Sequence, residues 1–174
     1  MKKILLFISV LALFILCGVP GCSVLPTPKE ALPAATQTGT NIFGCLVNGK
    51  VWLPKGYNGT SNLSPSYDPN FNGKIIFDIS TYRILSDNDK QYLGIGIVGL
   101  DTVGTYAVND TIGFARFSKD QCSYMYYDHT VYRKGSIKIT KLSLPIVSGT
   151  FDFILFKSGC DTLKATQGRF DLKF

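Results

Sequence analysis

The side chains best suited to acid–base chemistry are one histidine and eleven aspartates. His129 directly follows Asp128, a pair that invites comparison with hydrolases. A catalytic triad, however, needs a base held between a nucleophile and an orienting carboxylate, whereas adjacent residues on a strand point to opposite faces. Aspartate is common in tight turns, so we interpret this pair as the tip of a hairpin and predict no catalytic residue there.

Carboxylate pairs and metal-binding spacings give no clearer signal. A glycosidase uses two carboxyl groups, usually including a glutamate, but the single glutamate, Glu30, precedes the predicted folded domain. Asp87 and Asp89 flank Asn88 as in a calcium-binding loop, yet the glutamate that completes an EF-hand is absent, so we interpret them as a turn. The sequence has no C-x-x-C motif and no phosphate-binding glycine loop. We therefore expect no metal, no cofactor and no enzymatic activity.

Aromatic side chains are the feature with binding character, because tyrosine and tryptophan offer rigid faces that stack on planar or sugar-like partners. They gather in residues 124–132 and around the polar stretch 54–73. That stretch lacks strand periodicity, and loops of such length are either disordered or functional. An alternative for residues 124–132 is ordinary packing, since alternate residues share one face of a strand. Our candidate ligand-binding residues are Tyr57, Tyr67, Tyr124 and Tyr126.

Alternation of apolar and polar residues predicts the strands that must position these side chains. In residues 134–174 the pattern fits four short strands with one buried and one solvated face. Asn48-Gly49 between two apolar runs predicts a two-residue hairpin turn. About ten or eleven strands in one domain, residues 42–174, indicate an all-β antiparallel sandwich or a partly closed barrel. The other expected strands lie at residues 74–82, 91–99, 105–108, 112–117, 122–127 and 130–132.

Gly94 and Gly96 leave one face of the predicted strand 91–99 nearly bare. We expect a neighbouring aromatic side chain to lie over these glycines, or the strand to bend there. The alternative is that a ligand approaches this face closely.

Three cysteines lie in the predicted domain, so at most one internal disulfide can form. We expect Cys122 to pair with Cys160, because both lie at the edges of predicted strands or loops. Cys45 lies in an apolar strand, and we expect it to be a buried free thiol.

Residues 1–21 resemble a signal peptide, with Lys2 and Lys3 ahead of an apolar run that is too short to span a bilayer comfortably. The Val-Pro-Gly-Cys sequence ending at Cys22 resembles the bacterial lipobox, in which the cysteine is lipidated and becomes the new N-terminus. Residues 22–41, rich in Pro, Thr and Ala, would then form a flexible tether reaching up to ~60 Å at ~3.3 Å per residue. The alternative is an ordinary secretory signal with an incidental cysteine.

The formal net charge of +6 falls to +4 without Lys2 and Lys3, which leaves 16 basic against 12 acidic residues. The remaining basic residues are scattered along the chain and form no continuous run. This distribution disfavours a nucleic-acid partner.

Several short motifs resemble those of an uncharacterised family of small Bacteroidota lipoproteins. They are Phe-Gly-Cys-Leu-Val-Asn-Gly-Lys at 43–50, Gly-Ser-Ile-Lys-Ile-Thr at 135–140, Ser-Gly-Thr-Phe at 148–151 and Gly-Arg-Phe-Asp at 168–171. The resemblance covers most of residues 42–174. It implies an all-β domain with a lipid anchor, and it adds no catalytic residue.

We therefore expect a lipid-anchored protein of the cell envelope, placed in the outer membrane, with a non-enzymatic domain. Its expected partner is a glycan or an envelope protein, bound through the 54–73 loop and the nearby tyrosines. Two alternatives stay open, namely an envelope hydrolase acting on glycans or peptides and a structural subunit of an outer-membrane assembly. A pocket that brings His129 or two aspartate carboxylates within reach of each other would favour the hydrolase, and a stable stoichiometric partner would favour the assembly.

Overall fold

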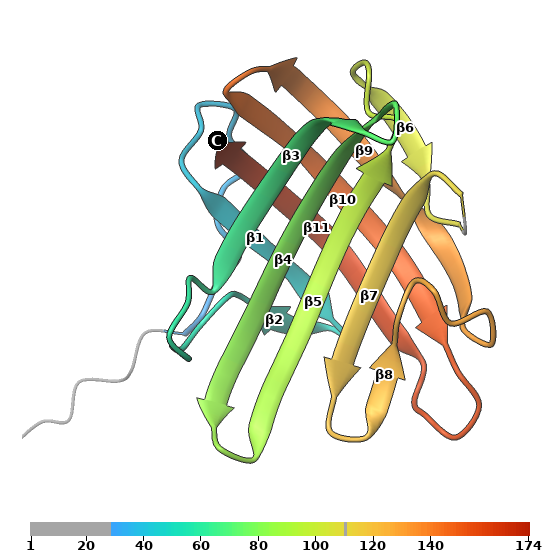
Figure 1. The fold of residues 1–174 in the computed structure, drawn as a ribbon. Coiled ribbons are helices and arrows are strands. Elements are labelled where there is room, and N and C mark those ends of the chain that lie inside the picture. Colours follow the sequence, from blue (N-terminus) through green and yellow to red (C-terminus); the bar gives the residue numbers. More distant parts are fainter. Residues whose placement is uncertain (1–28, 110) are drawn as a thin grey trace, which may run out of the picture.

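The computed structural model describes residues 29–109 and 111–174 as two antiparallel β-sheets that face one another, as Figure 1 shows. Sheet A has the strand order β2-β1-β11-β10-β9-β6, and sheet B has the order β3-β4-β5-β7-β8. The predicted all-β fold is confirmed as an open sandwich. The strands are β1 (Ile42–Val47), β2 (Lys50–Trp52), β3 (Leu63–Phe71), β4 (Lys74–Ser86), β5 (Asp89–Val98), β6 (Gly104–Ala107), β7 (Gly113–Lys119), β8 (Cys122–Tyr124), β9 (Tyr132–Ser143), β10 (Ile146–Phe156) and β11 (Leu163–Lys173).

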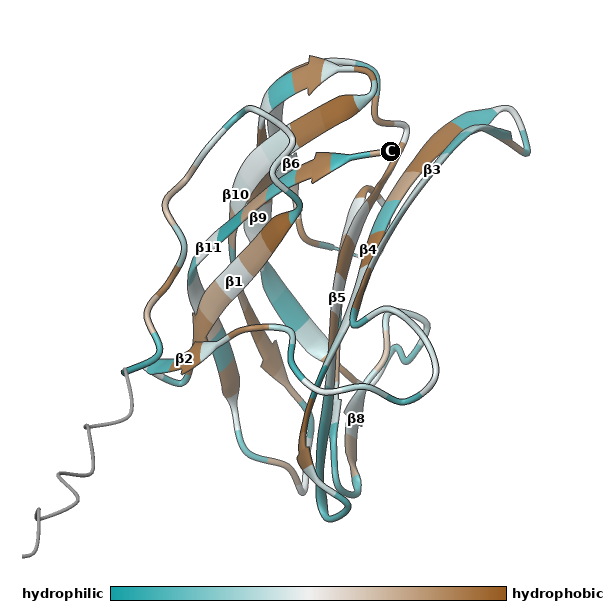
Figure 2. Ribbon diagram, turned by 90° about the vertical axis from the view of Figure 1, so that its left-hand side faces the viewer, coloured by the Kyte–Doolittle hydropathy of each residue, from teal (hydrophilic) through white to brown (hydrophobic). Residues whose placement is uncertain are grey.

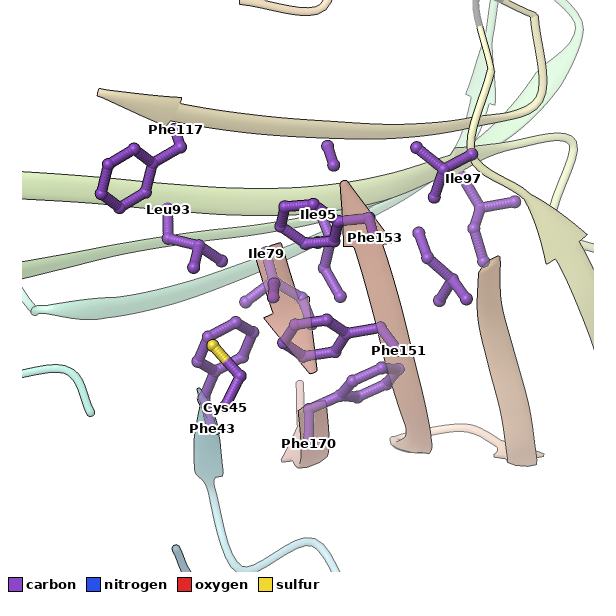
Figure 3. Close-up of a cluster of buried hydrophobic side chains, with 14 of the residues drawn as sticks. Phe43, Cys45, Ile79, Leu93, Ile95, Ile97, Phe117, Phe151, Phe153 and Phe170 are labelled. Atoms are coloured by element: carbon purple, nitrogen blue, oxygen red, sulfur yellow. The ribbon is translucent and has the colours of Figure 1, made fainter. Parts of the chain in front are cut away.

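The core fills the space between the two sheets with aliphatic and aromatic side chains from alternate strand positions. Figure 3 shows Phe43, Phe151 and Phe170 of sheet A facing Ile79 and Leu93 of sheet B. Each fully buried side chain of this size stabilises the fold by about 1.5 to 3 kcal/mol. The largest fully buried side chains are Phe77, Phe153, Phe170, Ile79, Leu93, Ile95, Ile97, Leu100, Ile137, Ile139, Leu155 and Leu172.

The predicted β1–β2 hairpin is confirmed. Asn48 and Gly49 have φ values of 47° and 79°, the left-handed conformation that a two-residue hairpin turn requires. The hairpin ends at Trp52, which is 2% exposed and donates its indole N–H to Gln91 Oε1 at 2.9 Å. Because Gln91 belongs to β5, this hydrogen bond joins the two sheets at one end of the sandwich.

The C-terminal residues form three long strands instead of the four short ones predicted. β11 runs continuously past a bulge at which Thr166 and Gln167 together lie opposite one residue of β10, and Gln167 has φ 52°. An extra residue reverses the face to which later side chains point. The buried side chains therefore switch from Leu163 and Ala165 to Phe170 and Leu172, a change that resembles the end of a strand in the sequence.

The predicted loop 54–73 is wrong over the nine residues Leu63–Phe71, which form β3 and pair with β4. This strand lies at the edge of sheet B and alternates half-buried Leu63 and Tyr67 with exposed serines. Proline lacks the N–H that a central strand needs, so Pro65 and Pro69 are tolerated at an edge and discourage further pairing there. The sequence shows these residues as turn formers, which hides the strand.

The predicted tether is also corrected in part, because the segment 30–41 is bound to the outer face of sheet A. Figure 2 shows it running beside β1 and β11, on the side away from sheet B. Arg169 donates from Nη1 to the carbonyl of Pro33 at 3.1 Å. Asp171 accepts hydrogen bonds from residues 36–40. Glu30 forms ion pairs with Lys55, which follows β2, and with Arg83 of β4. Cys22 and the predicted signal peptide lie outside the described residues.

Cys122 and Cys160 form a disulfide, the pairing expected from the sequence. It joins β8, at the edge of sheet B, to the loop that connects β10 and β11 of sheet A. Tyr124 reinforces this junction by donating its hydroxyl to the carbonyl of Asp161. Cys45 is a free thiol and is fully buried, and burial raises its pKa to about 12.

Candidate functional site

The four tyrosines selected from the sequence do not form one site. Tyr67 lies on β3 and Tyr124 on β8, the two opposite edges of sheet B, and Tyr124 is only 3% exposed. Tyr57 lies in the loop before β3 and is 78% exposed. Tyr126 packs against Phe114 on β7, with ring centroids 5.2 Å apart. Of the four, Tyr126 alone belongs to the site described below.

The remaining loop, residues 54–62, is attached to sheet B rather than open. The backbone N–H of Asn58 donates to the hydroxyl of Tyr82 at 3.3 Å, and that hydroxyl donates to the carbonyl of Thr60. Lys55 forms backbone hydrogen bonds with β4 on both sides of Arg83. The loop thus covers Tyr82, which is 5% exposed, and the structure gives it a packing role.

The Asp128–His129 pair lies in the turn between β8 and β9. Asp128 accepts hydrogen bonds from the backbone N–H and the hydroxyl of Thr130, and it pairs with Lys157 Nζ at 2.9 Å. Hydrogen bonds from Thr130 and Lys157 hold the pKa of the Asp128 carboxyl well below its usual range. The carboxylate therefore stabilises the turn, as the hairpin interpretation predicts.

Within residues 29–109 and 111–174, no group of three or more His, Cys, Asp and Glu side chains is placed to hold a metal ion. The same residues include no helix of the length and apolarity that crossing a membrane requires.

A cleft of about 670 Å³ opens between the sheets at the end formed by the β1–β2, β4–β5 and β7–β8 turns. Its polar side chains bond to one another. Trp52 donates to Gln91, Gln91 donates to Asp89 at 2.7 Å, and Asp89 lies 3.6 Å from Lys119 Nζ. Arg83 is 8% exposed and is held by Glu30 at 2.7 Å. Because these side chains already have hydrogen-bond or ion-pair partners within the protein, we interpret the cleft as a polar layer that covers this end of the core.

The outer face of sheet B has a different character, which starts from the two glycines of β5. A Cβ at Gly94 would lie 2.5 Å from Arg116 Nε, and a Cβ at Gly96 would lie 2.2 Å from Phe114 Cζ. The side chains of β7 therefore lie flat across β5. The prediction that an aromatic ring covers the glycines is right at Gly96, whereas an arginine covers Gly94.

Arg116 crosses β5 to reach β4. Its Nη2 donates to Asp78 Oδ1 at 2.8 Å and to Ser80 Oγ at 2.7 Å, and Ser80 donates in turn to Asp78 at 2.9 Å. The guanidinium carbon lies 5.5 Å from the centroid of the Phe114 ring, a cation–π distance. These contacts hold the guanidinium against the sheet, and the Arg116 side chain stays 22% exposed.

Exposed aromatic rings flank this polar group on both sides. Tyr126 packs on Phe114, and Tyr127 contacts Tyr126 edge-on at 5.3 Å, with 47% and 66% of the two tyrosines exposed. Tyr92, 45% exposed, lies on the same face of β5, four residues before Gly96. At ~3.3 Å per residue the aromatic groups are separated by ~13 Å. We call this surface the sheet B platform; it comprises Asp78, Ser80, Tyr92, Phe114, Arg116, Tyr126 and Tyr127.

The segment that builds this platform also matches a protein family. The model described as Domain of unknown function (DUF6252) matches residues 73–171. The chain belongs to the DUF6252 family. The match starts at the turn before β4 and ends in β11, so it includes every strand of the platform, while β1, β2 and β3 precede it. No curated protein and no solved structure shows significant similarity to this DUF6252 chain.

The DUF6252 platform contains a depression of about 390 Å³ beside Arg116. Outward-facing Ser80, Tyr92 and Ser118 line it, and Met125 closes one side. Hydroxyl groups, a planar guanidinium and a tyrosine ring therefore meet around one shallow hollow.

Apart from the tyrosines of the stretch 124–132, sequence reasoning missed the platform, whose five other members are Asp78, Ser80, Tyr92, Phe114 and Arg116. The spacing Gly-x-Gly at 94–96 and Phe-x-Arg at 114–116 was a usable signal, because both pairs fall on alternate positions of predicted strands. Only the register Gly94↔Arg116 and Gly96↔Phe114 brings them together, and a sequence does not show a register.

Proposed function

We propose that this DUF6252 protein is a lipid-anchored protein of the cell envelope whose β-sandwich binds glycan chains without catalysing a reaction. The observation that carries the binding proposal is the sheet B platform, where exposed rings lie on both sides of a fixed guanidinium. The signal-like residues 1–21 and the lipobox-like sequence ending at Cys22 support the location in the cell envelope. The motif resemblance to small Bacteroidota lipoproteins supports an outer-membrane location.

The chemistry of the platform suits a carbohydrate. A sugar ring has an apolar C–H face that packs on an aromatic ring, and its hydroxyls need donors and acceptors in the plane beside that ring. Tyr126 and Tyr127 offer the faces, and Arg116 offers a rigid fork of N–H donors. Both bonds from Arg116 and Ser80 go to Oδ1 of Asp78, so its Oδ2 and the hydroxyl of Ser80 provide neighbouring acceptors.

The shape of the platform suits a chain of several sugars. A single sugar would be enclosed by a deep pocket, whereas this surface is flat and its two aromatic groups are ~13 Å apart. The depression beside Arg116 lies between them and would take one ring or a side branch. A protein partner would need a larger buried area, on the order of 800 Å² per partner, with an apolar centre.

The platform argues for binding over hydrolysis. Glycosidases use two carboxyl groups on either side of the scissile bond. The platform contains one carboxylate, Asp78, and its oxygen already accepts from Arg116 and Ser80. A carboxylate held in this way orients a guanidinium and has no second carboxylate beside it on the platform.

The test is a printed array of neutral, aminated and uronic-acid oligosaccharides, followed by calorimetry on any hit. Tyr126→Ala and Tyr127→Ala should each weaken binding about fivefold or more, which corresponds to the ~1 kcal/mol of an aromatic contact. Arg116→Lys should also weaken binding, because it keeps the charge and loses the planar fork. Tyr132→Ala is the matched control, since Tyr132 is exposed on β9 of sheet A, the sheet opposite the platform. A flat array, or an equal loss in Tyr132→Ala, would contradict the proposal.

A further inference from the structure

A second exposed patch lies on the opposite side of the sandwich, on the outer face of sheet A. Ile154 and Phe156 point outward from β10 and are 37% and 46% exposed. In the strand register Phe156 lies beside Tyr132 of β9, which is 55% exposed. Three apolar side chains thus form a short row at one end of the sheet.

Lysines flank this row on both sides. The register places Ile154 directly between Lys134 of β9 and Lys164 of β11, and both lysines are exposed. The strands β9, β10 and β11 carry two carboxylates, of which Asp171 is buried and Asp152 exposed. We call this surface the sheet A patch; it comprises Tyr132, Lys134, Ile154, Phe156 and Lys164.

We propose that the sheet A patch contacts a phospholipid surface that carries anionic headgroups. Apolar side chains of this size enter the boundary between headgroups and acyl chains, while neighbouring lysines keep their ammonium groups at the level of the phosphates. Lysine is depleted in the centre of protein–protein interfaces, so two lysines beside Ile154 favour lipid over a protein partner. This inference rests on the cell-envelope location given in the proposed function.

The course of the N-terminal segment agrees with this orientation. Glu30 is held by Lys55, just after β2, and β2 lies three strand spacings from β10, or ~14 Å. The eight residues from Cys22 to Glu30 span at most ~26 Å. A lipidated Cys22 and the sheet A patch can therefore reach the same bilayer surface, which leaves the sheet B platform facing away from it.

The test uses residues 29–174, which contain all eleven strands and the buried core but no lipidation site. The probes are sedimented vesicles of phosphatidylethanolamine alone or with phosphatidylglycerol. We expect binding to the vesicles with phosphatidylglycerol, weakened by salt, and at least tenfold weaker binding by the double variant Ile154→Ser, Phe156→Ser. Lys134→Gln with Lys164→Gln should lose the preference for phosphatidylglycerol.

The matched control is the double variant Tyr126→Ser, Tyr127→Ser, which removes two exposed rings from the opposite face and should bind vesicles normally. Absence of vesicle binding at low salt, or equal loss in this control, would overturn the inference. Sedimentation velocity adds a further outcome, because self-association abolished by Phe156→Ser would assign the patch to a second copy of the chain and also overturn it. Glycan binding is measured without vesicles, so failure of this inference and failure of the proposed function are distinguishable.

Discussion

The carboxylate of Asp171 fastens the N-terminal segment to sheet A, and removing its charge should weaken the fold. The side chain is fully buried on β11. Its two oxygens accept hydrogen bonds of 2.7–3.2 Å from six donors, which are the hydroxyl of Ser148, the hydroxyl of Thr36, the backbone N–H of Thr38, the backbone N–H of Gly39, and the backbone N–H and hydroxyl of Thr40. Burial alone would raise the pKa of Asp171, but hydrogen bonds from Ser148, Thr36 and the backbone lower it well below its usual range.

The change Asp171→Asn keeps the size of the side chain and removes its charge. A hydrogen bond to a charged acceptor contributes about 1.5 to 3 kcal/mol, against about 0.5 to 1.5 kcal/mol for a neutral one. If each of the six bonds weakens by ~0.5 kcal/mol, the free energy of unfolding falls by about 3 kcal/mol. The amide NH₂ also faces donors on at least one side, which leaves buried groups without acceptors and adds to the loss.

Urea titrations of the native chain and the variant, repeated between pH 7 and pH 3, measure this effect. The folded pKa of Asp171 lies below its ordinary value of 3.8, so the carboxylate's contribution is complete above about pH 5 and is lost as the pH falls through 3.8 toward the folded pKa. The difference between native chain and variant should therefore shrink at acidic pH. Asp152→Asn, at an exposed position on the same sheet, is the control and should change stability by under about 0.5 kcal/mol. A difference below 1 kcal/mol at pH 7, or one that does not change with pH, would refute this reasoning.

Three further predictions concern the cysteines and the glycines of β5. Replacing Cys122 and Cys160 by serine should lower the free energy of unfolding by about 4 kcal/mol, because the disulfide closes a loop with a sequence separation of 38, and urea titration would show it. The Cys45 thiol, with a pKa raised by burial to about 12, should react with a thiol reagent at pH 8 only as fast as the chain unfolds. Gly96→Ala should cost about 1 to 3 kcal/mol in the same titration, because its Cβ would lie 2.5 Å from a backbone oxygen of β4, whereas Gly94→Ala should cost less because the flexible end of an arginine can move.

Local patterns in the sequence predict those parts of the fold that depend on local physics. Asn48-Gly49 specifies its turn because both residues tolerate positive φ, and Ile137 with Ile139 shows a buried face because side chains alternate along a strand. The disulfide follows from where Cys122 and Cys160 fall relative to strands. The bulge at Gln167 defeats the same reasoning, since one extra residue changes the phase of the alternation.

Long-range contacts determine the parts that sequence reasoning missed. Residues 30–41 are rich in Ala and Thr and lack strand periodicity, and nothing local distinguishes them from a tether. Their attachment depends on Asp171 and on the pairing of Glu30 with Arg83, partners far away in the chain. The platform has the same origin, because Arg116 covers Gly94 only through the register between β5 and β7.

The two glycines of β5 connect the stability of the sandwich to its proposed function. Glycine in a strand interior costs roughly 0.5 to 1 kcal/mol relative to alanine, and β5 is the central strand of sheet B. The gap at Gly94 is what lets Arg116 reach Asp78 across β5, and the gap at Gly96 is what lets the Phe114 ring lie over β5 and pack against Tyr126. A β-branched residue at either position would suit a plain structural strand better. The loss of stability at these two glycines is explained if the protein needs the flat surface that they allow, as a glycan-binding face on sheet B would.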